Sequence, residues 1–317
     1  MMRVSYESAS LHSDDQRDVF ARFWFDGADA GERTPRDFQT GLRQVGGAPV
    51  CEVWRSDQPS QTDVDDGVAM VISERYLLLC ATADGPDMRA ASHDAYRRLL
   101  KTQEARGYPN IVRTWNSVPD INVGDGDDEH YKRFCVGRSE AFDAYGPTAG
   151  APPAATAVGS VEPGPLRVFL LASHSEPRLL ENPRQVSAYR YPRQYGPRSP
   201  AFSRAAVLNG EDAPLLYLSG TAAITGHESR HVGDAGRQIA ETLENIRQLA
   251  TSAGVGPPHA VLRVYLREAE LADEALSYLN ETFTHPPQLV AVVADLCRKE
   301  LLVEIDGVLR AATGVAA

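Results

Sequence analysis

The sequence predicts an α/β (α+β) protein made of two tandem modules, each a mixed β-sheet with helices on one face. Three observations lead to this fold class. The chain of 317 residues is long for a single hydrophobic core. Its content of 43% hydrophobic and 24% charged residues is typical of a folded globular protein. Two segments of equal length, 95–115 and 245–265, align without a gap, which indicates a duplicated structural unit.

The elements of the first module follow from hydrophobic pattern and turn residues. Residues 76–84 (YLLLCATAD) predict a strand that ends in a turn of small residues. Residues 95–115 predict a helix, a break that contains Gly107 and Pro109, and a strand that ends at Trp115. A second helix is expected at 127–143, followed by the strands AATAVGS and LRVFLLAS. The proline- and alanine-rich stretch 146–155 looks like a linker between domains, but the repeat places it inside the first module.

The second module repeats the same order, which is two strands, a helix, a strand, a helix and two strands. Residues 214–222 (PLLYLSGTA) match the early strand, and a helix at 270–283 matches the second helix. The strands QLVAVVADL and ELLVEIDGVL complete the copy. We therefore assign residues 1–178 to an N-terminal module and 179–317 to a C-terminal, catalytic module. The sequence predicts no function for the first ~60 residues.

Composition excludes several classes of function. The formal net charge of -11 and a sequence pI near 5.2 argue against nucleic acid as a partner, because phosphate binding needs a basic surface. No apolar run reaches the ~20 residues of a membrane span, and the N-terminal residues lack a secretory signal, so we expect a cytoplasmic protein without a membrane contact. The four cysteines are scattered without a CxxC pair, which predicts neither a disulfide framework nor a structural metal site.

One segment carries a charge pattern unlike the rest of the chain. Between Arg184 and Arg204 the sequence contains five arginines and three tyrosines but no carboxylate. Arginine presents a planar fork of donors that matches a carboxylate, so one interpretation is a binding site for a small anionic ligand. The other interpretation is a solvated loop whose arginines face water or pair with acidic residues elsewhere. The pattern alone does not decide between them.

Glu304 stands where the two copies differ. The alignment places it at the strand position that Phe169 holds in the first copy, between Val303 and Ile305. If this carboxyl group faces the interior, burial raises its pKa and makes it a general acid near neutral pH. The alternative is an outward-facing residue of an alternating, half-exposed strand.

The string from His227 to His231 fits the HExxH pattern of zinc proteases. That motif requires a helix, so that both imidazoles share one face. Here Gly226 precedes the string and Gly233 follows it, and we expect the next helix to begin only after Asp234 as its N-cap. The string is therefore predicted to lie in a loop, and we expect no metal.

Several motifs resemble known families. The second half resembles the Rid family in its SGT turn at 219–221, the Gly-Asp pair at 233–234, the QxxETLxN string at 238–245 and the VEI strand at 303–305. The whole chain resembles the chorismatases, a family with a Rid-like C-terminal half. The motifs that carry this second resemblance are RGYPNIVRTWN (106–116), YKRFCVGR (131–138), ATAVGS (155–160), NPRQVSAYRYPRQYGPRSPAFSRA (182–205), SGTAAITGHES (219–229) and DLCRKELLVEIDG (295–307).

The chorismatase resemblance implies an enzyme that removes the enolpyruvyl group of chorismate without a cofactor. It implies that Glu304 is the general acid. It also implies that Arg204, Tyr191 and one arginine of the strand VLRVYLR hold the substrate carboxylates. Arg267 and Arg263 are spaced i, i+4 there and share a face, and Arg267 is the first choice.

Three further residues are predicted to line the substrate site. Tyr195 belongs to the same arginine- and tyrosine-rich segment. Gly220 and Thr221 form a turn that can bring backbone close to a ligand, although the same residues also fit a plain strand end.

Cys297 decides the expected subtype. The resemblance implies that hydroxybenzoate-forming chorismatases carry a cysteine here, so 3-hydroxybenzoate is the favoured product and Cys297 a catalytic residue. The alternatives are hydrolysis to a dihydroxycyclohexadiene carboxylate, or 4-hydroxybenzoate. A buried cysteine is also often just a small apolar residue. More distant readings are a Rid-like imine deaminase and a non-catalytic binding protein. A monomer is expected, because one chain supplies both modules.

Overall fold

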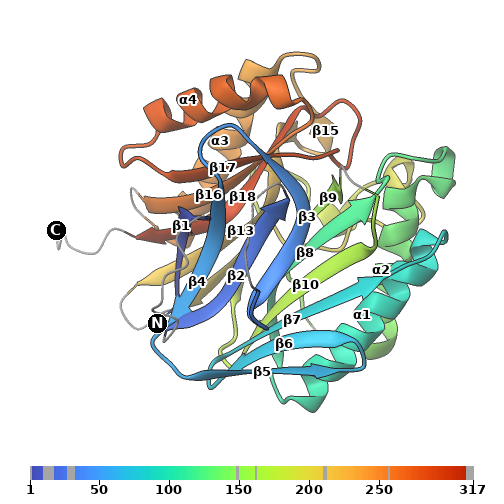
Figure 1. The fold of residues 1–317 in the computed structure, drawn as a ribbon. Helices are drawn as coiled ribbons and strands as arrows, with labels where there is room; N and C mark the ends of the chain where they lie inside the picture. Colours follow the sequence, from blue (N-terminus) through green and yellow to red (C-terminus); the bar gives the residue numbers. More distant parts are fainter. Residues whose placement is uncertain are drawn as a thin grey trace.

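The computed structural model describes residues 2–9, 18–26, 33–147, 150–160, 163–209, 213–255 and 258–311. The predicted fold class is confirmed. Two mixed sheets lie face to face, and each carries a pair of helices on its outer face, as Figure 1 shows. The molecule therefore has four layers in the order helices, sheet, sheet, helices.

The first repeat forms a six-stranded sheet with the strand order β5-β6-β7-β10-β8-β9. Its strands are β5 (Ser60–Asp65), β6 (Val68–Ser73), β7 (Tyr76–Ala83), β8 (Asn110–Pro119), β9 (Ala154–Ser160) and β10 (Leu166–Ser173). Helices α1 (Met88–Ala105) and α2 (His130–Tyr145) cover the outer face, and a 3-10 turn, η1 (Gly126–Asp128), precedes α2. The second helix thus begins three residues later and ends two later than predicted. The stretch 146–155 runs from α2 to β9 as the repeat predicts.

The second repeat has the same strand order, β11-β12-β13-β18-β16-β17, so the predicted duplication is confirmed. Its strands are β11 (Arg178–Leu180), β12 (Ala205–Asn209), β13 (Pro214–Ala222), β16 (Pro258–Leu266), β17 (Gln288–Val293) and β18 (Val303–Ala311). Its helices are α3 (Ala235–Ala253) and α4 (Ala272–Thr282), with the 3-10 turn η4 (Ala269–Leu271) before α4. Asp234 caps α3 as predicted, because its side chain accepts the Arg237 N–H.

Strand register supports the alignment of the two copies. Trp115 of β8 lies opposite Phe169 of β10, and Tyr265 of β16 lies opposite Glu304 of β18. Phe169 and Glu304 therefore occupy equivalent positions in the two sheets.

The first four strands join the sheet of the second repeat. They are β1 (Met2–Ser8), β2 (Val19–Asp26), β3 (Asp37–Val45) and β4 (Val50–Ser56), and β3 pairs with β17 to give a ten-stranded sheet. The division at residues 178 and 179 stays a prediction. The pairing shows that the N-terminal strands take their sheet neighbours from the C-terminal half.

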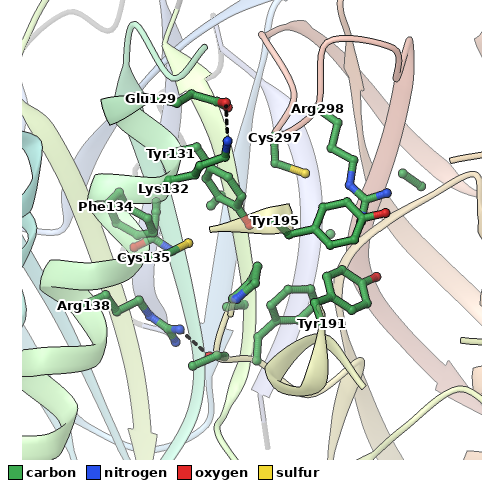
Figure 2. A pocket seen from close by; sticks show the side chains of 18 of the residues that line it. Glu129, Tyr131, Lys132, Phe134, Cys135, Arg138, Tyr191, Tyr195, Cys297 and Arg298 are labelled. Carbon is green, nitrogen blue, oxygen red and sulfur yellow. Dashed lines mark hydrogen bonds and ion pairs between the residues drawn. The ribbon is translucent and has the colours of Figure 1, made fainter. Parts of the chain in front are cut away.

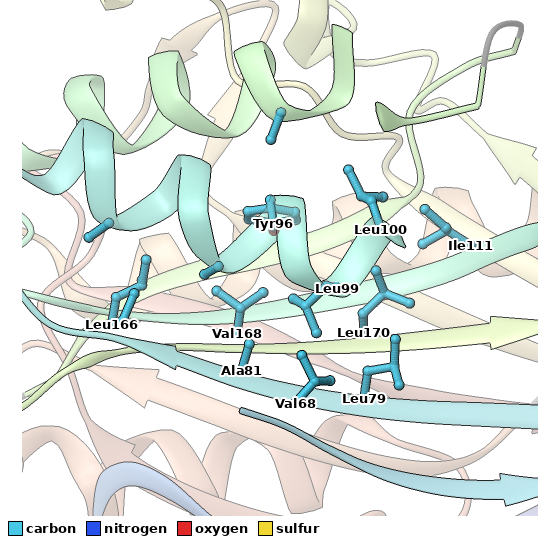
Figure 3. Packing of buried hydrophobic residues seen from close by; sticks show 14 of the residues in the cluster. Val68, Leu79, Ala81, Tyr96, Leu99, Leu100, Ile111, Leu166, Val168 and Leu170 are labelled. Atoms are coloured by element: carbon cyan, nitrogen blue, oxygen red, sulfur yellow. The ribbon is translucent and has the colours of Figure 1, made fainter. Parts of the chain in front are cut away.

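Three layers of apolar side chains hold the four layers of structure together. Leu79 and Tyr96 belong to the core between the six-stranded sheet and its helices (Figure 3). An equivalent core lies under α3 and α4. Aromatic rings fill the space between the sheets, where the ring centroids of Trp54 and Trp115 are 5.7 Å apart and those of Phe23 and Phe169 are 5.3 Å apart.

None of the helices in the described ranges is long and apolar enough to cross a bilayer. The expected cytoplasmic location and monomeric state stay predictions.

Candidate active site

A cavity of about 360 Å³ lies where the two repeats meet. The first repeat supplies the loop before α2, one face of α2 and the start of β9. The second repeat supplies the segment 191–204, the end of β13, the loop 297–300 and Glu304. Figure 2 shows the side chains of α2 on one side of this space and those of the second repeat on the other. Both halves of the chain therefore build the site.

Glu304 lies in the wall of this cavity and is only 4% exposed. Its strand neighbours Val303 and Ile305 are also buried, because β18 is a central strand of a sheet that is covered on both faces. The alternative of an outward-facing residue is therefore wrong. Burial raises the pKa of Glu304 to about 8, and the negative charge of Asp306 adds to the rise, whereas Arg204 and Arg298 oppose it. The carboxyl group is thus protonated at neutral pH.

Gly220 lets the carboxyl group reach the cavity. A Cβ atom built on Gly220 would lie 2.0 Å from Oε1 of Glu304 and 3.3 Å from Cγ2 of Thr156. No other residue type leaves this space, so glycine is required here for a close approach rather than for an unusual backbone angle.

Gly220→Ala is expected to lower the turnover of this site about 10²-fold, since the added methyl group would push the carboxyl away from its position. The fold should survive, because the clash is with the end of a flexible side chain. Turnover and the melting temperature should be measured together. Gly236→Ala is the matched control, because Gly236 lies in the first turn of α3 and outside the cavity lining. Equal activity of the two variants would contradict the role of Gly220.

Two buried arginines line the cavity with unused donors. Arg204 is 3% exposed, donates to Tyr191 Oη at 2.7 Å and to the Val186 carbonyl at 2.9 Å, and leaves Nε without a partner in the described part of the chain. Arg138 of α2 is 5% exposed, donates to the Ala201 carbonyl and leaves Nε and Nη2 without partners there. A buried guanidinium with free N–H groups beside a cavity is suited to bind a carboxylate.

Tyr191 and Tyr195 also line the cavity, and the guanidinium of a third arginine, Arg298, packs on their rings. The guanidinium carbon of Arg298 lies 4.1 Å from the ring centroid of Tyr195 and 5.3 Å from that of Tyr191. Figure 2 shows Arg298 above the two rings. The same guanidinium donates to the carbonyl of His227 at 2.9 Å, and the Tyr195 hydroxyl donates to that carbonyl at 2.6 Å. Residue His227 therefore supports the aromatic wall.

The prediction that the HExxH string is not helical is confirmed. The string lies in a loop except for Glu228–Ser229, which form the short strand β15 and pair with β14 (Ile224–Thr225). Within the described ranges, no three or more His, Cys, Asp or Glu side chains are grouped so that they could hold a metal ion.

Three of the predicted binding residues are placed outside the cavity lining. Arg267 donates to the Leu301 carbonyl and to Asn122 and Asp295, and so holds the loop that precedes β18. Arg263 pairs with Glu52 at 2.8 Å between the two sheets.

The third, Thr221, donates its hydroxyl to the Ser219 carbonyl. The i, i+4 spacing of Arg263 and Arg267 predicted that they share a face of the strand. It could not show which groups their side chains contact.

Most arginines of the segment 184–204 support the loop, as the second interpretation of that segment held. Arg184, Arg193 and Arg198 form ion pairs with Glu241, Asp127 and Asp143. Arg204 fits the first interpretation, because it lines the cavity and one of its N–H groups has no partner in the described part of the chain.

Two thiols face the same cavity. Cys297 lies in the loop before β18 and Cys135 on α2, and burial raises the pKa of each thiol to about 12. Both are therefore neutral thiols near pH 7 rather than nucleophilic thiolates.

Sequence reasoning missed Arg138, Cys135 and Arg298. Arg138 and Cys135 belong to the motif YKRFCVGR (131–138), which carried the family resemblance but no charge pattern of its own. The face of a helix that points to a partner sheet is fixed only by tertiary packing, so this part of the site had no local signal.

The fold and the cavity define an α/β protein that presents a protonated, buried carboxyl group between guanidinium groups, in a space fit for a small anion. Residues 52–172 match a family model described as "Chorismatase FkbO/Hyg5-like, N-terminal". A 3-hydroxybenzoate synthase of Streptomyces hygroscopicus is 36% identical over 279 residues, which cover 82% of this chain and 81% of that protein. A chorismatase of Streptomyces rapamycinicus is 35% identical over 273 residues, 81% of each chain.

The fold of the chain is also similar to that of a solved structure over nearly its full length. The crystal structure of a chorismatase matches with a TM-score of 0.86 and 26% identity, and the match covers 98% of both chains. The chain belongs to the chorismatase family, as the sequence resemblance predicted.

Proposed function

We propose that this protein converts chorismate to pyruvate and 3-hydroxybenzoate without a cofactor, and that Glu304 is the general acid. The observation that carries the proposal is the buried carboxyl group of Glu304 in the cavity wall. With its pKa raised to about 8 by burial, the carboxyl group keeps its proton at pH 7. A neutral carboxylic acid is what the protonation of an enol ether requires.

The two buried arginines suit the two carboxylates of chorismate. We assign one carboxylate to Arg204, supported by Tyr191, and the other to Arg138. The rings of Tyr191 and Phe202 offer flat apolar surface to the cyclohexadiene ring, and Arg204 lies 5.1 Å from the Phe202 ring centroid. Which carboxylate meets which arginine sets the distance from Glu304 to the enolpyruvyl methylene group.

The reaction begins with transfer of the Glu304 proton to the methylene carbon. The neighbouring carbon then carries an oxocarbenium charge, and the ionised Glu304 lies beside it as a counter-ion. In hydrolysis, one water adds to this carbon and the product collapses to pyruvate and the diene acid. In the hydroxybenzoate branch one water also adds to this carbon, but the ring loses its hydroxyl group as water, so no net water is consumed while pyruvate leaves and the ring becomes aromatic.

Cys297 supports the choice of the hydroxybenzoate branch. The thiol lines the cavity and is neutral at pH 7, so it can donate a hydrogen bond to a departing or strained oxygen but cannot attack as a thiolate. The 36% identical relative named 3-hydroxybenzoate synthase favours the same product.

Cys297→Ala is expected to change the product ratio by tenfold or more toward the diene acid, with a smaller change in the rate of chorismate loss, since about 1.4 kcal/mol between two branches is a factor of ten. The product ratio should be measured by chromatography with mass detection. Cys80→Ala is the matched control, because Cys80, like Cys297, is a partly buried cysteine whose thiol has a pKa of about 12, and it does not line the cavity. An unchanged ratio in Cys297→Ala would remove the thiol from the mechanism.

The proposed function is tested by incubating the purified protein with chorismate and no added metal or cofactor. The products are compared with 3-hydroxybenzoate, 4-hydroxybenzoate and the diene acid, and pyruvate is measured in parallel. Equimolar pyruvate and 3-hydroxybenzoate would support the proposal. The diene acid or 4-hydroxybenzoate would keep the reaction class but reject the product. Unconsumed chorismate would reject the function and favour the deaminase or binding-protein alternatives.

A further inference from the structure

Asp306 is a second buried carboxylate close to Glu304. The two residues are i and i+2 on β18, so both side chains point to the same face of the sheet, with Cα atoms about 7 Å apart. Asp306 is 2% exposed and lies between the two sheets. It does not line the cavity, so it does not touch a ligand bound there.

Three donors fix Asp306 in place. Its Oδ2 atom accepts from Arg113 Nη2 at 2.6 Å, from Thr156 Oγ1 at 2.7 Å and from Tyr265 Oη at 2.7 Å. Arg113 has no exposed surface, and its guanidinium carbon lies 4.6 Å from the Trp115 ring centroid. A carboxylate that accepts one charged and two hydroxyl donors is held in one position.

The charges that act on Glu304 oppose one another. The cations Arg204 and Arg298 face Glu304 and favour its carboxylate, whereas the negative charge of Asp306 opposes it. The other titratable neighbours are the Tyr131 hydroxyl and the Cys297 thiol, which are neutral near pH 7 because their pKa values are raised by burial. Among the described residues, desolvation is the larger cause that keeps the proton on Glu304, and the charge of Asp306 is the second.

We propose that Asp306 is a positioning residue for the reaction, and that its fixed negative charge keeps the Glu304 carboxyl protonated and ready to donate. This proposal rests on the proposed function, because it assumes that protonated Glu304 is the general acid of the reaction. Asp306 acts through Glu304 and does not contact the substrate. The Arg113–Asp306 ion pair between the sheets thereby sets the pH range in which Glu304, in the cavity wall, can donate its proton.

The test is Asp306→Asn, which keeps the shape and removes the charge. The titration midpoint of Glu304 is read directly from the infrared band of its protonated carboxyl, with Glu304→Gln as the spectral blank. We expect the midpoint to fall by about 1–3 pH units from the wild-type value. The midpoint of the alkaline limb in the pH profile of kcat/KM for chorismate should move to lower pH by the same amount. The variant should therefore lose activity at pH 8 and regain it at pH 5.5. An unshifted midpoint would overturn the proposal.

Glu52→Gln is the matched control. Glu52 is a buried carboxylate in the same layer, paired with buried Arg263 at 2.8 Å, but it is not among the charges that act on Glu304. We expect a similar loss of thermal stability and an unshifted Glu304 midpoint. Equal shifts in both variants would mean that general damage, not the charge of Asp306, moves the midpoint.

A second variant keeps the test decisive if Asp306→Asn does not fold. Asp306→Asn with Arg113→Gln removes both members of the ion pair and leaves no unpaired buried cation. The same downward shift of the midpoint is expected, because the charge of Asp306 is absent again. The infrared readout needs no turnover. A wild-type protein that does not consume chorismate would therefore refute the proposed function, while the midpoint would still decide the role of Asp306.

Discussion

Glu304→Gln is expected to reduce kcat for chorismate by about 10²–10⁴-fold, because the amide cannot deliver the proton that starts the reaction. Binding should change little, since glutamine keeps the size of the side chain beside Gly220 and the arginines that hold the carboxylates are untouched. Steady-state kinetics gives kcat, and calorimetry with chorismate gives the dissociation constant of the inactive variant.

A matched control for this variant is Glu244→Gln on the exposed side of α3, where the carboxylate pairs with Arg247. It should be as active as the wild-type protein. If Glu304→Gln turns over chorismate at the wild-type rate, another group must donate the proton and the assignment is wrong.

The same assignment fixes the sign of the pH dependence. Glu304 donates only in its protonated form, and burial and the charge of Asp306 raise its pKa to about 8. Activity should therefore be retained across the neutral range and fall as the pH rises through about 8. A profile that instead rises through this range would require Glu304 to act as a base.

Arg204→Met should raise KM for chorismate by about 10–150-fold, which corresponds to the loss of a charged hydrogen bond of about 1.5–3 kcal/mol. The methionine keeps much of the apolar contact of the side chain but removes the N–H group that has no partner among the described residues. The variant also loses the hydrogen bonds to Tyr191 and to the Val186 carbonyl, so the melting temperature must be measured with the kinetics.

Arg198→Met provides the comparison, because Arg198 comes from the same segment but forms an exposed ion pair with Asp143. Its removal should leave KM within a factor of two, as expected for a surface ion pair. If the two variants have the same KM, the charge of the segment rather than the specific position of Arg204 attracts the substrate.

The sequence was sufficient for features that depend on local pattern. The duplicated order of elements could be predicted because each copy repeats its own hydrophobic periodicity and turn residues. The position of Glu304 followed from the same alignment, and strand register confirms its equivalence to Phe169. The burial of Glu304 did not follow, since alternation along one strand cannot show that a second sheet covers its other face.

The sequence was insufficient wherever distant segments meet. Arg267 has the right residue type and spacing, but its donors are taken by the loop that it supports. Arg138 has no local signal and reaches the cavity because α2 packs beside the second repeat. The N-terminal strands likewise gave no sign that they belong to the sheet of the other half.

The pairing of β3 with β17 has a consequence for how the chain acquires its structure during synthesis. Val45 lies opposite Ala291, so a strand that leaves the ribosome early in this sequence pairs with one that leaves much later. At about 5–20 residues per second, roughly 10–50 s separate the two events. For that time the nascent chain carries an unsatisfied strand edge, a feature that recruits other polypeptides. Such distant pairing slows folding, so yield in a cell should depend on chaperones that shield this edge until β17 is synthesised.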